Sequence, residues 1–256
     1  MPRYSIADLC ISNDELRYYY NVAKSIQNVD MSFFYNLDKI FSIMLENRDR
    51  FPRVVVSGEN NPQLYLTRLV KGYCDAMNCL PSQRIASPKT SCTDPAIRII
   101  VQHTQRCSDE VAANGEYIHN LFMSAENVQG NLLEEYIARN VRPYGFLWCN
   151  GNIMRAVDFC DTFGRVFLQI KNKNNTENSS SSNIREGTTI KKWYRLGTRT
   201  EAGFKKPVFK WMDLNDIINS NKTEGFTSRP CYMNEEDYNK FLRNVAFWNS
   251  NIISGN

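Results

Sequence analysis

The stretch that decides the fold is Asp158-Phe-Cys-Asp-Thr-Phe-Gly-Arg-Val-Phe-Leu-Gln-Ile-Lys171. It predicts two strands joined by a turn over 161–164, because apolar runs flank a short polar segment that contains a glycine. Alternate side chains of a strand point to opposite faces of a sheet. Gln169 and Lys171 therefore share one face of the second strand, and the residues between and before them supply an apolar face.

The first strand is expected over 153–160, with Asp158 near its end. If the turn is centred near 162–163, Asp158 lies opposite Phe167 and diagonal to Gln169, roughly 7–8 Å away at the backbone. Oxygen-bearing side chains at that spacing can hold one small cation such as Mg²⁺, and the Ile170 carbonyl can add a ligand. With Lys171 stabilising developing charge, the pattern is typical of metal-dependent phosphodiester cleavage.

Gln169 is the irregular member of this pattern, because an amide oxygen brings no negative charge. None of the 13 lysines follows an Asp or Glu at the second position, and Gln169-Ile-Lys171 is the single Gln version. A carboxylate from the acidic helix expected over 127–139 can restore the charge. Helical phasing slightly favours Glu135 over Glu134, and both acids can equally be ordinary solvated residues. The triplet by itself is also compatible with a half-buried strand that has a solvated outer face.

Helical periodicity precedes and follows this centre. Apolar residues recur at helical spacing over 13–48, 61–78, 95–124, 213–219 and 234–248, with a Pro-containing loop over 80–95. Further strands are expected over 146–149, 190–196 and 208–214, and Asn150-Gly151 predicts a tight hairpin. The chain therefore divides into a mainly helical part (1–125), a catalytic core with a recognition loop (126–215) and a helical tail (216–256), which we interpret as a single nuclease domain over 1–256.

Composition excludes several classes of protein. No segment is apolar for long enough to span a bilayer, and no signal peptide opens the chain, so we expect a soluble, cytoplasmic protein without a membrane partner. The eight cysteines form no C-x-x-C pair and are expected to be free thiols. His103 and His119 form no metal pair or nuclease pattern, and no glycine-rich phosphate loop is present.

Positive charge is concentrated in one segment. Residues 165–210 carry 11 basic and three acidic side chains, a net charge of +8, whereas the whole chain carries +4. A basic segment on a mildly acidic body indicates a polyanion-binding protein, although a solvated surface has the same composition.

The motif Asp158–(10 residues)–Gln169-Ile-Lys171 resembles the PD-(D/E)XK nucleases. The longer run from Gln169 to Arg185, followed by Gly187-Thr and Trp193, resembles type II restriction endonucleases of the SinI kind. This resemblance is strongest over 127–215. It implies an α/β fold with a mixed five- to six-stranded sheet flanked by helices and a helical N-terminal part. It also implies Mg²⁺-dependent cleavage of double-stranded DNA at a short palindromic site by a homodimer, with a cognate DNA methyltransferase protecting the host genome.

The resemblance also assigns roles to residues. Asp158 and Gln169 take the positions of the metal-binding acids, and Lys171 takes that of the catalytic lysine. The family's Gly-x-x-Leu-Glu pattern falls on Glu134, which we therefore prefer to Glu135 as the helix acid. The catalytic set is Asp158, Gln169, Lys171 and Glu134, and the metal-binding set is Asp158, Gln169, Ile170 and Glu134.

The polar run over 172–189 has the composition of a linker, but its place after the candidate catalytic strand favours a functional loop. Its Asn and Ser side chains can donate to phosphates and base edges, and Arg185 can read guanine bidentately. Basic residues on the next strand suit phosphates. The expected DNA contacts are Asn172, Lys173, Asn174, Asn178, Ser179, Ser180, Ser181, Arg185, Lys191, Lys192 and Arg195.

Two other functions remain open from the sequence. Gln169 is compatible with a catalytically degenerate protein that binds DNA on the same scaffold without cutting it. A structure-specific repair nuclease acting on branched or damaged DNA would need the same site residues.

Overall fold

The computed structural model describes residues 3–4, 6, 10–55, 61–86, 95–173, 188–223 and 227–253. Contacts along the chain separate two compact units, one formed by 1–79 with 137–235 and the other by 80–136 with 236–256. The interpretation of 1–256 as a single nuclease domain stays a prediction.

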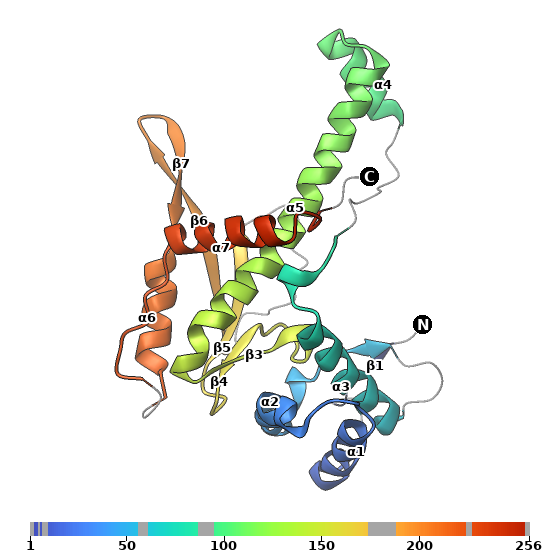
Figure 1. The fold of residues 1–256 in the computed structure, drawn as a ribbon, viewed down its shortest axis with the longest axis vertical. Coiled ribbons are helices and arrows are strands. Elements are labelled where there is room, and N and C mark those ends of the chain that lie inside the picture. The colour runs from blue at the N-terminus through green and yellow to red at the C-terminus, as the bar shows by residue number, and fades with distance from the viewer. Residues whose placement is uncertain are drawn as a thin grey trace. The chain divides into compact units, whose positions relative to one another are not determined.

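The first unit is built on a mixed five-stranded sheet with the strand order β3-β4-β5-β6-β7 (Figure 1). Only the β5–β6 pair is parallel; the other neighbouring pairs are antiparallel. The predicted α/β fold with a mixed sheet is confirmed. The strands are β3 (Phe146–Trp148), β4 (Phe159–Asp161), β5 (Phe167–Lys173), β6 (Ile190–Glu201) and β7 (Phe204–Phe209).

A helical N-terminal part, also as predicted, covers one face of this sheet. Its helices are α1 (Asn13–Ser25), α2 (Tyr35–Glu46) and α3 (Pro62–Asn78), with short 3-10 turns η2 (Met31–Phe34) and η3 (Arg48–Arg50) and a two-stranded sheet of β1 (Arg3–Tyr4) and β2 (Val54–Val55). Their apolar sides form one core with Cys160, Phe167 and Ile190 of the sheet. Burial of these large side chains supplies most of the stabilisation of the unit.

The opposite face of the sheet contacts α6 (Trp211–Asn221). The indole rings of Trp193 and Trp211 lie 5.2 Å apart between centroids, and the Trp193 N–H donates to the Lys210 carbonyl at 2.8 Å. The strand expected over 208–214 is therefore shorter than expected. It ends at Phe209, because Trp211 packs under the sheet as the first residue of a helix.

The second unit contains η4 (Pro81–Gln83), α4 (Pro95–Gln105), most of α5 (Asp109–Val141) and most of α7 (Glu235–Trp248). The Tyr136 ring packs against Tyr238 and Phe241, with ring centroids 5.2 and 5.7 Å apart. The two helices expected over 95–124 and 127–139 were wrongly divided. The break falls near Arg106, which has a φ of 53°, and α5 continues through Gly115. An interior glycine costs only about 1 kcal/mol, which packing offsets.

Two general features concern the described part of the chain. No helix there combines the length and the apolar character that a membrane span requires. None of the seven described cysteines forms a disulfide, and four of them are buried: Cys74, Cys149, Cys160 and Cys231. Cys92 lies outside the described residues.

The connection from β3 to β4 corrects the predicted hairpin. Asn150–Asn152 forms a 3-10 turn (η6) rather than a two-residue hairpin loop. The Asn150 side-chain amide donates to the Ala76 carbonyl at 3.0 Å, and Gly151 (φ 72°) lies so close to α3 that a Cβ would stand 2.7 Å from the Gly72 carbonyl. Docking on α3 thus bends the chain, and the strand expected over 153–160 shrinks to β4.

The turn between β4 and β5 is fixed by Asp161, whose side chain is fully buried. Its Oδ1 accepts the backbone N–H groups of Arg165 (2.6 Å) and Val166 (2.9 Å), and its Oδ2 accepts Arg165 Nε (2.7 Å). Cys160 consequently pairs with Phe167, and Phe159 with Leu168. The predicted register, with Asp158 opposite Phe167, was two residues off, because the sequence pattern does not reveal this side-chain cap.

We expect Asp161→Asn to lower the free energy of unfolding by roughly 2–3 kcal/mol, because charge-assisted hydrogen bonds to a buried carboxylate are lost. Urea unfolding followed by circular dichroism measures the change. Asp216→Asn is the matched control, since Asp216 is exposed on α6. Equal stability of the two variants would contradict the role given to Asp161.

Candidate active site

The pairing of β4 with β5 brings Asp158 beside Gln169. Asp158 directly precedes β4, and its N–H donates to the Leu168 carbonyl at 2.8 Å, so the pairing continues past the strand. Its Oδ2 accepts the Ile170 N–H at 2.7 Å. Among the described residues no donor is paired with Oδ1. One carboxylate oxygen is therefore fixed by the neighbouring strand, and the other is available to a ligand.

Gln169 lies in the middle of β5 and is 7% exposed. Its Oε1 is buried and accepts no hydrogen bond from any described residue. A buried amide oxygen without a partner costs about 1–3 kcal/mol, so such atoms generally have a ligand in the functional state. This orphaned oxygen next to a carboxylate suits a small hard cation.

The parallel β5–β6 pairing brings Lys192 to the candidate site. The sequence had predicted only a contact of this lysine with DNA phosphates. Gln169 pairs with Lys192, and Lys171 pairs with Tyr194. Paired residues of neighbouring strands share a face, so Lys192 stands beside Gln169 on the same face as Lys171. Lys191 pairs with Leu168 and belongs to the opposite face. Two lysines therefore border the Asp158–Gln169 pair.

Burial raises the pKa of Asp158 from 3.8 to about 6. Desolvation is the main cause, because the charged carboxylate loses water. The Ile170 N–H and the nearby Lys171 ammonium act in the opposite direction and keep the pKa from rising further. At neutral pH the carboxylate is ionised but poorly solvated, and a bound cation would compensate for that desolvation.

The residues could hold Mg²⁺ through oxygens rather than through an acidic cluster. No group of three or more His, Cys, Asp and Glu side chains gathers in the described part of the chain. The candidate donors are Asp158 Oδ1 and Gln169 Oε1, and the Ile170 carbonyl as a third ligand stays a prediction. This set has the oxygen chemistry that Mg²⁺ prefers, with water completing the coordination.

The helix acids Glu134 and Glu135 belong to the second unit. Both oxygens of Glu135 are hydrogen-bonded within that unit, to the backbone N–H and the hydroxyl of Ser82, each at 2.7 Å. Glu135 therefore has a local role at the start of η4. Glu134 is half-buried. Its assignment as the helix acid of the site stays a prediction.

The expected DNA contacts fall into three groups. Asn174, Asn178, Ser179, Ser180, Ser181 and Arg185 lie outside the described residues. Lys173, Lys191 and Lys192 are exposed on β5 and β6. Arg195 instead donates to Asn172 Oδ1 (2.9 Å) and to Glu235 Oε1 (2.5 Å), and its side chain is 11% exposed. Arg195 and Asn172 thus hold β5, β6 and the start of α7 together, and a DNA role for them stays a prediction.

Arg50 is a further basic residue on the Gln169 face that the sequence did not single out. Its guanidinium carbon lies 5.3 Å from the centre of the Phe167 ring, and its Nη2 lies 3.4 Å from Thr189 Oγ1. Phe167 is two residues before Gln169 on the same face. No periodic signal marks Arg50, because it follows a helix by a short 3-10 turn.

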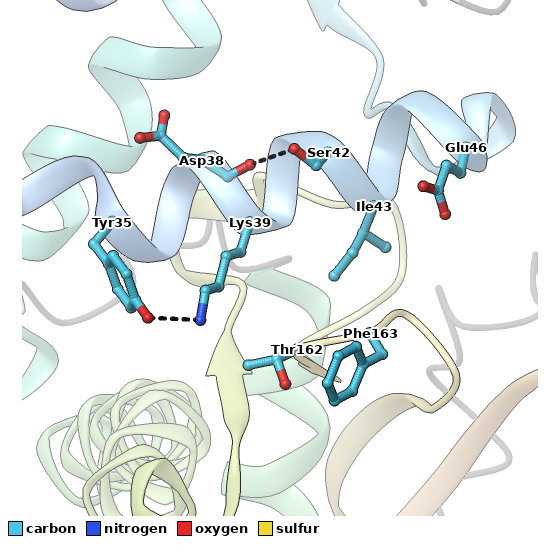
Figure 2. Close-up of a pocket in the computed structure, with 8 residues that line it drawn as sticks. All are labelled: Tyr35, Asp38, Lys39, Ser42, Ile43, Glu46, Thr162 and Phe163. Atoms are coloured by element: carbon cyan, nitrogen blue, oxygen red, sulfur yellow. Dashed lines mark hydrogen bonds between the residues drawn. The ribbon is translucent and has the colours of Figure 1, made fainter. Parts of the chain in front are cut away.

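A separate pocket of about 420 Å³ lies between α2 and the β4–β5 turn (Figure 2). It contains none of the predicted site residues. Asp38, one of its acids, already accepts the Tyr20 hydroxyl (2.8 Å) and the Lys24 ammonium (2.7 Å). Its lining residues are Tyr35, Asp38, Lys39, Ser42, Ile43, Glu46, Thr162 and Phe163. The pocket has no counterpart to the orphaned oxygen of Gln169, so the strand site is the better candidate.

The family model and the relatives that match this chain all describe type II restriction enzymes of one kind. The family model of the SinI restriction endonuclease matches residues 42–221, more than two thirds of the chain. The type II restriction enzyme Eco47I of Escherichia coli is 35% identical over 165 residues, which are 63% of this chain and 65% of that enzyme, just under two thirds. The type II restriction enzyme SinI of Salmonella infantis is 29% identical over 219 residues, 80% of this chain and 86% of that enzyme.

We expect Asp158→Asn to stabilise the metal-free protein at pH 8 by up to about 3 kcal/mol, since each pH unit of raised pKa corresponds to about 1.4 kcal/mol. A raised carboxyl pKa penalises the folded state above that pKa. The gain should be absent below pH 4, appear between pH 4 and 6, and be complete above pH 6. Urea unfolding at pH 4 and pH 8 measures it, and a variant less stable than the wild type at pH 8 would contradict the desolvation.

Proposed function

The chain belongs to the SinI restriction endonuclease family, and from that premise we propose that it cleaves double-stranded DNA at a specific site in a Mg²⁺-dependent reaction. The observation that carries the chemistry is the buried Gln169 Oε1 beside the Asp158 carboxylate, with no hydrogen-bond partner among the described residues and with Lys171 on the same strand face. A phosphodiester-cleaving site needs these oxygen ligands and a cation for the developing negative charge.

In this proposal Asp158 and Gln169 hold the metal, and the rigid β4–β5 pairing orients them. Mg²⁺, when bound, would polarise the phosphate and make a water molecule more acidic. The Lys171 ammonium stabilises negative charge on the attacked phosphate and orients the attacking water. Lys192 adds positive charge on the other side of Gln169. Hydrolysis adds water across the P–O bond and leaves one phosphate end and one hydroxyl end.

The finer parts of the proposal follow from symmetry and from protection of the cell. A duplex site with a two-fold axis is matched by two identical subunits, each of which cuts one strand. We therefore include a short palindromic site and a homodimer. A cell that carries such an enzyme needs its own sites protected, so a cognate DNA methyltransferase belongs to the proposal.

One specific observation favours a second candidate, a protein that binds DNA without cutting it. Gln169 contributes no negative charge, so the cation is held less strongly than it would be by two carboxylates. The basic segment over 165–210 would serve both functions equally well. Only a cleavage experiment separates the two.

That experiment compares the wild type with Lys171→Ala on plasmid DNA in Mg²⁺. The wild type should give discrete fragments, and the variant should cut roughly 10²–10³-fold more slowly, which is typical when one group that stabilises transition-state charge is removed. A filter-binding assay without divalent metal checks that the variant still binds. Binding without fragments would favour the second candidate, and nicking confined to branched DNA would favour a repair nuclease.

Lys192→Gln should lower the single-turnover cleavage rate at saturating enzyme by about tenfold, a change of about 1.4 kcal/mol in the barrier, because Lys192 shares the face of Gln169. Lys191→Gln is the matched comparison, one residue away on the opposite face. It should alter affinity for DNA more than the saturated rate. Equal effects of both variants on that rate would argue against a site role for Lys192.

A further inference from the structure

The β6–β7 hairpin continues beyond the sheet as a two-stranded ribbon (Figure 1). The last described β5–β6 pair is Lys173 with Leu196, whereas β6 pairs with β7 from Leu196 opposite Phe209 to Glu201 opposite Phe204. Past Leu196, β7 is the only described strand that β6 pairs with. Every residue from 198 to 210 is exposed. The ribbon therefore contributes little to the core of the unit.

The tip of the ribbon is ordered by a two-residue turn. Ala202 and Gly203 both have positive φ values, 51° and 81°. Turns of this kind match the right-handed twist of the strands that they join. The left-handed conformation of Ala202 costs about 1 kcal/mol, which a disordered loop would avoid. The ribbon is thus a preformed arm, and its tip presents Phe204, which is 74% exposed.

Positive charges on the ribbon repel each other when no ligand is bound to it. Arg199 lies directly opposite Lys206, and paired residues share a face, so two positive side chains meet there. Like charges at this position destabilise a sheet. Lys206 is compensated by Glu201 at 3.0 Å, but Arg199 has no partner among the described residues. Residues 197–210 carry four basic side chains and one acidic side chain.

The exposed edge of β7 is unsuited to a second copy of the chain. Pro207 has no N–H to donate to a further strand, and Lys205 and Lys206 place like charges where two ribbons would meet. A polyanion would neutralise the positive charges of the ribbon, and it would not need to pair with the edge of β7. The major groove of B-DNA admits a two-stranded β-ribbon, and its walls are lined with phosphates.

We propose that residues 197–208 form a second DNA-contact surface, with Arg199 and Lys206 on phosphates of the bound duplex. The inference rests on the proposed DNA-cleaving function and adds a surface to it. Arg199 follows Lys192 by seven residues, or about 23 Å along a strand. At that distance the ribbon contacts duplex outside the cleavage site. It anchors the flanking duplex and takes no part in the chemistry.

The test measures the salt dependence of binding to a 30-base-pair duplex of random sequence, with no divalent metal present. Arg199→Gln/Lys206→Gln should weaken binding at least tenfold at 0.1 M salt. It should also reduce the slope of log K against log salt by about 1.8, since each phosphate contact contributes about 0.9. The control is Arg17→Gln/Lys71→Gln, which should leave the slope unchanged. Lys71 and Lys206 are each 61% exposed and ion-paired with a nearby acid.

A charge-retaining variant, Arg199→Lys/Lys206→Arg, should keep the wild-type slope. If the slope of log K against log salt falls in both ribbon variants, the substitutions disturb the hairpin itself, and the proposal is overturned. An unchanged slope in the Gln variant would do the same. A changed sedimentation coefficient with an unchanged slope would instead assign the ribbon to contacts between copies. Cleavage by the wild type tests the proposed function separately, so a failure of the ribbon is distinguishable from a failure of the enzyme.

Discussion

The hydrogen bonds of the buried Asp161 carboxylate set the register of β4 against β5, and the candidate active site depends on that register. Asp161 holds the N–H groups of Arg165 and Val166, so β5 starts where Phe167 can pair with Cys160. A shift by one residue would turn every side chain of β5 to the other face. Gln169 would then enter the apolar layer that holds Trp193, and Asp158 would lose its contact with the strand.

The same register explains why an amide at position 169 is compatible with a metal site. Asp158 is already desolvated, and burial raises its pKa to about 6. A carboxylate at position 169 would place a second negative charge beside it and raise that pKa further in the metal-free protein. Gln169 supplies the oxygen without that repulsion. For the same reason, Gln169 attracts a cation less strongly than a carboxylate would. The positive charges of Lys171 and Lys192 suit a phosphate, which brings negative charge of its own.

Much of this site was predictable from the sequence, and the rest depended on tertiary contacts. Alternation along 165–171 correctly placed Gln169 and Lys171 on one face. The register was not predictable, because it depends on a side-chain cap within the turn. The Asn150-Gly151 pair favours a hairpin locally, but docking against α3 overrides that preference. The place of Lys192 beside Gln169 required knowledge that β6 runs parallel to β5, and nothing in the pattern of β6 distinguishes parallel from antiparallel pairing.

Strand β6 has a first half that packs within the sheet and a second half that is exposed to solvent. Its first half carries Ile190 and Trp193 in the two apolar layers, so these residues fix where Lys192 stands. Its second half extends beyond the sheet, and both of its faces are exposed. Charged side chains are tolerated there because they are not buried. Charge can accumulate there at little cost to the core, and Arg199 opposite Lys206 is the result. Because β6 runs unbroken from Ile190 to Glu201, one strand carries both Lys192 and Arg199 of the proposed DNA-contact ribbon.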